Sequence, residues 1–314
     1  MSSQITEAFV KQFSANVFHL SQQKGSKLRP LVRKEMQHSK AAFYDRIGAV
    51  SAVLKAGRHS STPQLDTPHS RRMVTMNDYE WADMIDDQDK IRMLNDPTSA
   101  YAQAAMWAMG RSQDDVIIAA ALGTAYSGED GTTSVILPAS QYVGAVNSGA
   151  SAISNLNIGT LIRVKSKFGI NEVDESIPLN IIVSQSQIDS LLADTQITSS
   201  DYATVKALVK GEVDSFMGFK FHRTQRLPVN GSGSFLASTT LATGAVALST
   251  GTSNNARRCF AWAEDGLLLS TGKDITGKIS ERADKSYSTQ VYACMSIGAV
   301  RMEEVKVVAV LCHE

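Results

Sequence analysis

A long polar segment between strand-like runs constrains the fold of this chain more than any other feature. The runs AAFYDRIG and GAVSAVLKA (residues 41–56) and RRMVTMNDYEWADMID (residues 71–86) carry the residue types typical of strands. Between them lies RHSSTPQLDTPHS, in which Pro63 and Pro68 exclude a helix and favour a turn-rich tip. A polar hairpin of about forty residues does not fit inside a compact core. We therefore predict that residues 33–75 leave the globular body and lie on an adjacent molecule.

The charges are segregated around this hairpin, although the chain as a whole is neutral. Residues 24–72 carry eleven basic and three acidic residues (net +8), whereas residues 73–100 carry seven acidic and two basic residues (net −5). Such blocks are often solvated faces, or they fold against each other. Alternatively, the basic block contacts an acidic surface on another copy of the chain, where complementary charges set register and partner choice. This second interpretation yields a set of candidate inter-subunit contacts: Arg33, Arg46, Lys55, Arg58, Arg71, Arg72, Asp78, Glu80, Asp83, Asp86, Asp87 and Asp89.

The strongest helix prediction begins at Asp96 and ends just before Gly123. Asp96 is a good N-cap, Pro97 suits the first helical position, and Gly123 suits the helix stop. Apolar residues recur between them at helical spacing, and we expect Trp107 to be largely buried against the late strands. Glycine in a helix interior is unfavourable by about 1 kcal/mol, so Gly110 indicates close packing or a bend.

The rest of the chain alternates helix-like and strand-like segments and then ends in strands, which predicts the α+β fold class. Residues 1–23 are expected to form a weak amphipathic helix or an extended arm. The uncharged stretch 229–256 is expected to form an ordered β-loop that neighbouring molecules cover. The remaining predictions are helices at 159–167, 184–193 and 199–209, a strand at 177–184, and late strands in GFKFHRTQRLP, RRCFAWAEDGLLLS, TQVYACMSIGAV and VKVVAVLC.

The composition excludes several classes of protein. Hydrophobic residues make up 43% of the chain, and 31 basic residues balance 31 acidic ones, whereas a dedicated nucleic-acid binder usually has a basic excess. Three scattered cysteines argue against a disulfide framework or a zinc ribbon. Neither a signal peptide nor an apolar run of membrane-spanning length occurs in the sequence. We therefore expect a chain made in a reducing cytosol, with no membrane partner.

No sequence motif predicts a catalytic residue, a cofactor or a metal site. GKDITGKI (272–279) matches the start of a P-loop, but Ile279 stands where magnesium binding needs Ser or Thr, so we expect a polar turn between strands. Acidic residues 86–89 could bind a cation, although a solvated patch is the commoner role of such a run. Cys312 and His313 are expected to end a strand.

The order of these parts resembles that of the major capsid proteins of tailed bacteriophages, which have the HK97-like fold. LRPLVRKEM followed by the hairpin is similar to the family's extended loop, and DDQDKIRMLNDPTSAYAQAAMWAMGRSQDDVIIAAALG is similar to its spine helix. GFKFHRTQRLP and RRCFAWAEDGLLLSTGKDI are similar to segments of its axial domain. The resemblance implies an N-terminal arm (1–32), an extended loop (33–76), a peripheral domain with the spine helix (77–130), an axial domain (131–272), returning peripheral strands (273–304) and a C-terminal strand (305–314).

The resemblance implies a protein that self-assembles into an icosahedral shell around a double-stranded DNA genome, without enzymatic activity. The implied partners are copies of itself, a portal, scaffolding or decoration proteins, and packaged DNA held by non-specific contacts. The implied locations are the virion capsid and, during assembly, the cytoplasm of the bacterial host. Two alternatives are the shell of a cellular nanocompartment with the same fold and a soluble α/β enzyme without a recognisable motif.

Overall fold

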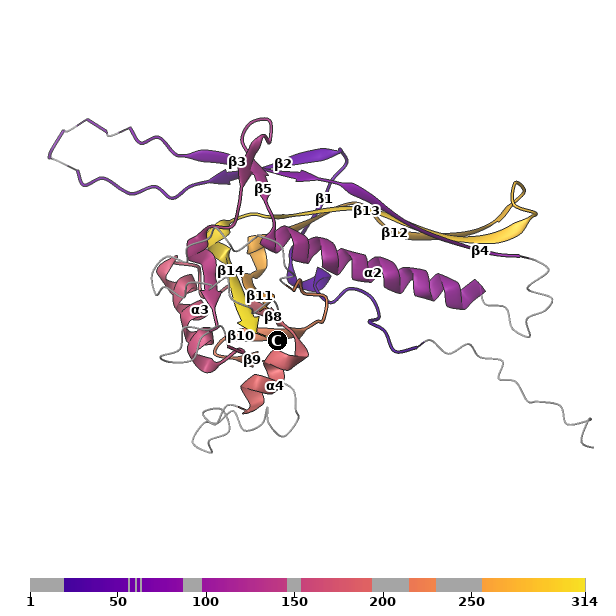
Figure 1. The fold of residues 1–314 in the computed structure, drawn as a ribbon. Coiled ribbons are helices and arrows are strands. Elements are labelled where there is room, and N and C mark those ends of the chain that lie inside the picture. The colour runs from indigo at the N-terminus through magenta and orange to yellow at the C-terminus, as the bar shows by residue number, and fades with distance from the viewer. Residues whose placement is uncertain are drawn as a thin grey trace, which may run out of the picture. The chain divides into compact units, whose positions relative to one another are not determined.

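The structure, a computed structural model, describes residues 20–55, 57–59, 61–62, 64–86, 98–145, 154–193, 215–229 and 256–313. The chain divides into two compact units. Unit 1 comprises Met1–Ser26, Asn77–Gln113 and Gly272–Ile297, and unit 2 comprises Lys27–Met76, Asp114–Thr271 and Gly298–Glu314. Helices and strands occur together, which confirms the α+β class (Figure 1).

Unit 2 contains a mixed six-stranded sheet in the order β7-β14-β11-β8-β10-β9. Strand β11 is antiparallel to both of its neighbours, whereas β8 pairs with β10, and β7 with β14, in parallel. The strand bounds are Tyr142–Gly144 (β7), Leu179–Val183 (β8), Ser215–Phe216 (β9), Phe219–Arg223 (β10), Ala256–Ala263 (β11) and Val307–His313 (β14). The late strands predicted in GFKFHRTQRLP, in the first part of RRCFAWAEDGLLLS and in VKVVAVLC are confirmed in this sheet as β10, β11 and β14, whereas TQVYACMSIGAV forms a strand of another sheet.

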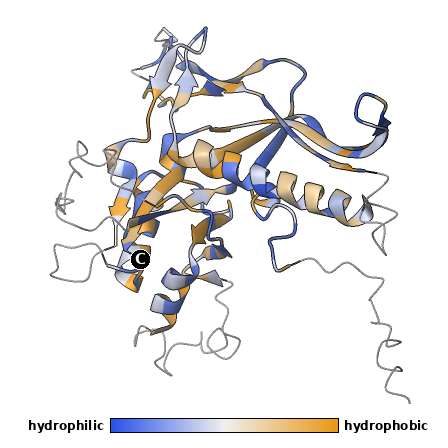
Figure 2. Cartoon of the chain, turned by 45° about the vertical axis from the view of Figure 1, so that its right-hand side comes forward, coloured by the Kyte–Doolittle hydropathy of each residue, from blue (hydrophilic) through white to orange (hydrophobic). Residues whose placement is uncertain are grey.

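The central strands form the core of unit 2 because their sequences are apolar on both faces. All residues of β14 except the last are buried, as are the last four of β8. Figure 2 shows this concentration of hydrophobic residues in the sheet. Helices α3 (Ile158–Ile170) and α4 (Gln185–Ala193) belong to the same unit, and Phe168 of α3 packs on Phe219 of β10 with ring centroids 6.2 Å apart. The side chain of Asn157 caps α3 by accepting a hydrogen bond from the Thr160 amide at 2.8 Å.

A four-stranded sheet at the root of the hairpin has the order β2-β3-β5-β6. Its strands are Ala41–Ile47 (β2), His69–Thr75 (β3), Ala125–Ser127 (β5) and Thr133–Val135 (β6). The described residues between β2 and β3 form no strand, so the predicted strand at 48–56 is wrong for its described residues (Figure 1). The ladder ends where the Gly48 amide donates to the Pro68 carbonyl at 2.8 Å, because proline has no amide hydrogen with which to continue the pairing.

In unit 1, β4 (Asn77–Ile85) pairs antiparallel with β13 (Ser288–Arg301) from Asn77↔Ile297 to Ile85↔Thr289. The sequence run 71–86 therefore forms two strands in different sheets, which separate at Met76. In unit 2, β1 (Arg33–Met36) pairs in parallel with the start of β12 (Leu267–Arg282). Residues 272–279 lie within β12, so the predicted turn there is wrong, and the extended backbone offers no loop that could surround a phosphate.

Helix α2 (Thr98–Leu122) confirms the predicted long helix. It ends before Gly123, whose amide donates to the Ala119 carbonyl at 2.8 Å, whereas the predicted cap at Asp96 and Pro97 lies outside the described residues. Gly110 is closely packed as predicted, because a Cβ atom there would lie 2.6 Å from the backbone of Gly25. The Trp107 side chain is only half-buried, with Lys24 Nζ 5.4 Å from its ring centroid, so the prediction of near-complete burial is wrong.

The other predictions divide between confirmed elements and segments that the structure does not describe. Helices α3 and α4 and strand β8 lie at the predicted places. The predicted helix at 199–209, most of the uncharged stretch 229–256 and residues 1–19 of the arm lie outside the described residues. Short 3-10 helices occur at Arg29–Leu31 (η2), Ala139–Gln141 (η3), Glu264–Gly266 (η4) and Glu304–Lys306 (η5).

Candidate assembly interface

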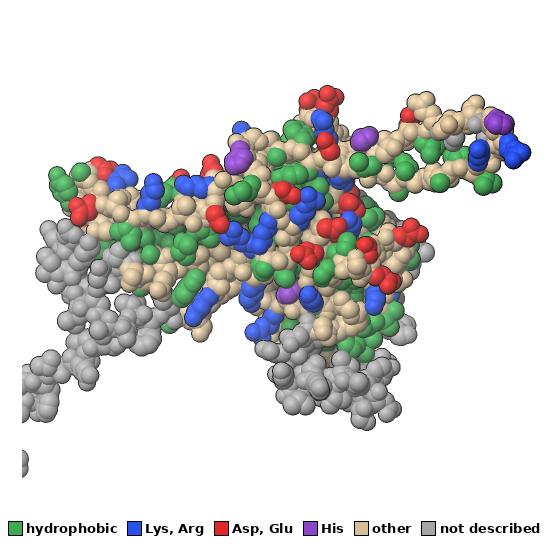
Figure 3. All heavy atoms as spheres, turned by 180° about the vertical axis from the view of Figure 1, so that it is seen from behind, with side chains coloured by type: hydrophobic (Ala, Val, Ile, Leu, Met, Phe, Trp, Pro, Cys, Tyr) green, Lys and Arg blue, Asp and Glu red, His purple; other side chains and the backbone are tan. Residues whose placement is uncertain are grey.

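The loop between β2 and β3 carries apolar side chains that the chain itself leaves uncovered. Leu54 is 92% exposed, and Ile47, Val50, Val53 and Leu65 are also exposed. Figure 3 shows hydrophobic side chains along this projecting hairpin and Lys, Arg and His side chains at its end. Lys55 and Arg58 of the candidate set lie in this exposed part. Exposed apolar side chains clustered on one segment are typical of an interaction surface.

At the root of the hairpin, Arg46 of β2 and Arg72 of β3 meet Glu304 of η5, all within unit 2. Arg72 Nη2 donates to Glu304 Oε1 at 2.5 Å and to the Met302 carbonyl at 3.4 Å. Arg46 Nη1 donates to the same carbonyl and lies 3.8 Å from Glu304 Oε2. These contacts tie both strands of the hairpin root to the segment that follows β13.

Arg301, the last residue of β13, completes this group, which we call the root arginine cluster (Arg46, Arg72, Arg301 and Glu304). Its Nε lies 3.8 Å from Glu304 Oε1, and its two Nη atoms donate to the carbonyls of Ala121, Gly123 and Val135. Desolvation by burial lowers the pKa of Arg72 and of Arg301, against the opposing effect of Glu304. Both guanidinium groups are fully enclosed by the chain.

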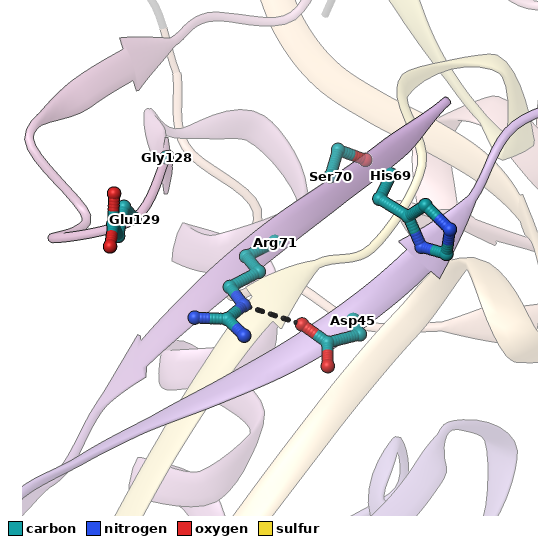
Figure 4. Close-up of a pocket in the computed structure, with 6 residues that line it drawn as sticks. All are labelled: Asp45, His69, Ser70, Arg71, Gly128 and Glu129. Carbon is teal, nitrogen blue, oxygen red and sulfur yellow. Dashed lines mark hydrogen bonds and ion pairs between the residues drawn. The ribbon is translucent and has the colours of Figure 1, made fainter. Parts of the chain in front are cut away.

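The opposite face of the same ribbon lines a pocket of about 470 Å³ in unit 2 (Figure 4). The Arg71 side chain points toward Asp45, with Nε donating to Oδ1 at 2.7 Å, while Glu129 comes from the turn between β5 and β6. His69, Ser70 and Gly128 complete the lining. Asp45 and Arg71 are cross-strand partners, so they share a face, whereas Arg46 and Arg72 lie on the other face. The Asp45–Arg71 ion pair and the Glu129 carboxylate are the charged groups of this lining.

The described acidic candidates lie on or just after β4, in unit 1, and are exposed. By strand alternation, Asp78 and Glu80 share one face and Asp83 lies on the other. Each accepts a hydrogen bond: Asp78 from Ser296 Oγ at 2.5 Å, Glu80 from Tyr292 Oη at 3.0 Å, Asp83 from the Met84 amide at 2.8 Å, and Asp86 from Ser288 Oγ. Asp87 and Asp89 lie outside the described residues.

The basic candidates differ in how far their side chains are exposed. Arg33 on β1 is exposed and pairs with Glu35 at 2.7 Å. Lys55, Arg58 and Arg71 also have exposed side chains, whereas Arg46 is mostly buried. Arg72 has no exposed surface to offer a neighbouring subunit, so it leaves the set of candidate surface contacts as a correction. Arg72 is inaccessible because its side chain lies on the inner face of β3.

Sequence reasoning did not identify Glu304 or Arg301. The residues of β13 up to Ile297 alternate between buried and partly buried positions, but the alternation breaks at Gly298, and Val300 and Arg301 are both buried. Strand alternation alone therefore does not indicate that Arg301 is buried. Glu304 lies in a short polar turn where nothing local distinguishes it from a surface carboxylate.

The pKa is also shifted for His222, which lies in unit 2, and for Cys294, which lies in unit 1. Burial lowers the pKa of His222 in unit 2, and Lys220 and Lys27 lower it further. The His222 ring hydrogen-bonds Asn180 Oδ1 at 3.1 Å. In unit 1, hydrogen bonds from Thr276 and then Lys273 lower the pKa of the Cys294 thiol. Among the described residues, no group of acids, histidines and cysteines could hold a metal ion, and no helix is long and apolar enough to cross a membrane.

The fold of the chain is similar to that of phage capsid proteins. The capsid chain of cyanophage P-SCSP1u matches with a TM-score of 0.72 at 14% identity, over 100% of this chain and 96% of that one. The capsid of Ralstonia phage GP4 gives a TM-score of 0.71 at 10% identity, covering 97% and 95% of the two chains. The acid-stable capsid of Helicobacter pylori bacteriophage KHP30 gives 0.71 at 11% identity, covering 100% and 98%. At these identities the matches define the fold, which is the HK97-like fold of a virus shell protein.

The sequence profile of the phage capsid protein family matches residues 5–314. The chain belongs to this family, and its function is that of a phage major capsid protein. No curated protein matches it. The family resemblance inferred from the sequence is thereby confirmed, and with it the virion capsid as the protein's location.

Proposed function

We propose that copies of this chain assemble through the hairpin into an icosahedral shell that encloses a double-stranded DNA genome. The observation that carries this proposal is the loop between β2 and β3, whose apolar side chains are exposed in the single chain. Covering one such side chain on a neighbouring subunit contributes about 1.5–3 kcal/mol when its burial is complete. A shell repeats that contribution at every subunit.

The charged residues of the hairpin set its register on the neighbour. Lys55 and Arg58 are exposed near the end of the loop, and Asp78, Glu80 and Asp83 are exposed on β4. We propose that these two groups meet between subunits. Each exposed ion pair contributes only about 0–1 kcal/mol, so the network and not one pair determines the alignment.

The proposed organisation follows the segments expected from the sequence: the arm (1–32), the extended loop (33–76), a peripheral part with α2 and the returning strands, and an axial part that includes the uncharged stretch 229–256. Assembly takes place in the cytoplasm of the bacterial host, with a portal and with scaffolding or decoration proteins as further partners. The subunit has a structural role without catalysis. Its zero net charge lets packaged DNA make non-specific contacts without tight binding.

A substitution at the most exposed apolar side chain tests the proposal. Leu54→Glu should leave the circular dichroism spectrum and thermal midpoint of the unassembled subunit unchanged, because the Leu54 side chain contacts little of its own chain. It should greatly reduce the yield of shells seen by sedimentation and negative-stain microscopy. Leu54→Met is the matched control and should assemble normally. Wild-type shell yield from the Leu54→Glu protein would contradict the proposed role of the hairpin.

A further inference from the structure

The root arginine cluster has more positive than negative charge. Glu304 is the only carboxylate of the described residues within 4.0 Å of the guanidinium groups of Arg46, Arg72 and Arg301. Three positive charges therefore face one negative charge in a region where two of the arginines are fully buried. A buried charge without a partner is destabilising by several kcal/mol.

The backbone accounts for one of the two surplus charges, that of Arg301, whose two Nη groups are bonded while its Nε is buried without a hydrogen-bond partner among the described residues. Arg301 donates to the Ala121 and Gly123 carbonyls at 2.9 Å and to the Val135 carbonyl at 3.2 Å. The first two lie at the C-terminal end of α2, where the helix dipole is negative and favours a cation. Arg46 and Arg72 remain, and they share Glu304 and one carbonyl oxygen, that of Met302.

Several donor groups of this pair have no acceptor. Nε of Arg46, and Nε and Nη1 of Arg72, are buried and have no hydrogen-bond partner in the described part of the chain. A buried unsatisfied donor is unfavourable by about 1–3 kcal/mol, and more when it is charged. The Nε and Nη1 groups of Arg72 stand free although Nη2 already binds Glu304. Arg46, which is partly exposed, can bind a second carboxylate, because the planar fork of a guanidinium group matches carboxylate geometry.

The cluster reaches the surface at one side. The Arg46 side chain is 21% exposed and that of Glu304 is 19% exposed, whereas Arg72 and Arg301 are enclosed. Both exposed members belong to the hairpin root or to the segment bound to it. An acidic side chain from outside would contact the exposed part of Arg46, and its charge would offset the surplus without touching the covered donors of Arg72.

We propose that a carboxylate from a second copy of this chain completes the root arginine cluster in the assembled shell. The proposal rests on the proposed self-assembly through the hairpin, because the cluster lies at the root of that same element. The chain itself provides the chemistry: Glu129, for example, is an exposed carboxylate present on every copy. The single subunit thus holds an incomplete charge site, and assembly supplies the missing anion.

The test compares the unassembled subunit with the shell. Arg72→Met removes one surplus charge and its free donors while keeping most of the side-chain volume, and Glu304 then serves Arg46. We expect the unassembled Arg72→Met subunit to keep or raise its thermal midpoint. We expect its shell to dissociate at a lower guanidinium concentration than the wild-type shell. Arg282→Met removes an exposed arginine that pairs with Asp284 at 2.8 Å outside the cluster; it is the control and should lower neither midpoint.

Two further arms make the outcome decisive. Arg46→Met, which is partly exposed, repeats the comparison if the Arg72 variant does not fold, with the same expected pattern. The unassembled wild-type subunit is also heated with increasing inorganic phosphate: a midpoint that rises in wild type but not in Arg72→Met, with shells of equal stability, would assign the site to a free oxyanion and overturn our assignment. Equal destabilisation of subunit and shell would show a self-contained cluster and would also overturn it. Failure of wild-type protein to form shells would instead contradict the proposed function.

Discussion

Replacing Gly110 by alanine sets two effects of opposite sign against each other. Alanine favours a helix interior over glycine by about 1 kcal/mol, so helix propensity alone predicts a more stable protein. The added Cβ, however, would lie 2.6 Å from the Gly25 C and Cα atoms and 2.7 Å from the Ser26 amide nitrogen. Because non-bonded carbon atoms prefer roughly 3.5–4.0 Å, the arm segment would have to move by about 1 Å.

The steric effect should dominate. Overpacking of this kind costs about 1–3 kcal/mol, and here the obstacle is backbone and cannot rotate away. Subtracting the propensity gain, we expect Gly110→Ala to lower the free energy of unfolding by up to roughly 2 kcal/mol. The measurement is denaturant unfolding of the unassembled subunit, followed by circular dichroism.

Gly169 offers the matched control for this comparison. It lies in α3, and a Cβ there would meet no atom within 4 Å. Gly169→Ala should therefore be neutral or stabilising by up to about 1 kcal/mol. If Gly110→Ala stabilises the protein as Gly169→Ala does, then residues 25 and 26 do not lie against α2, and the steric argument is refuted.

Three further predictions concern side chains with unusual surroundings. Trp262→Ala should reduce the free energy of unfolding by about 3–5 kcal/mol, because Trp262 is fully buried, whereas Trp107→Ala should reduce it clearly less. Folding lowers the pKa of His222, so its contribution to stability should be complete above about pH 6.5 and be lost as the pH falls through the lowered pKa of the folded state. His222→Gln should remove this part of the pH dependence of the unfolding free energy. Cys294, with its lowered pKa, should react with iodoacetamide well before buried Cys312, whose pKa is raised, as mass spectrometry of timed samples would show.

The elements that the sequence predicts well are those whose pattern is local. Helix α2 is long and periodic, and its end at Gly123 is marked by residue type. Strands β8, β11 and β14 are short apolar runs between turns, and their burial on both faces follows from that composition. These elements can be predicted without knowing which strands or helices they contact, because their own apolar pattern already requires burial.

The elements that the sequence predicts poorly depend on a pairing partner. Residues 48–55 have strand-like composition but face a chain in which Pro68 lacks an amide hydrogen, so no ladder forms there. Residues 272–279 have the composition of a turn, yet they lie within β12, next to β13 in the sheet. In both cases the neighbouring strand, which is distant in sequence, overrides local propensity.

The candidate interface shows the same limit for charge. Arg71 and Arg72 are adjacent in sequence and contribute equally to the basic block, but strand alternation directs them to opposite faces of the hairpin root. Arg71 pairs with Asp45 on the exposed face, while Arg72 is enclosed with Glu304 on the inner one. A net charge counted along the chain therefore mixes residues that can contact another subunit, such as Arg71, with enclosed residues that cannot, such as Arg72. The positive charge of Arg72 nevertheless affects stability, because an unbalanced cation is far less favourable in a buried position than at the surface.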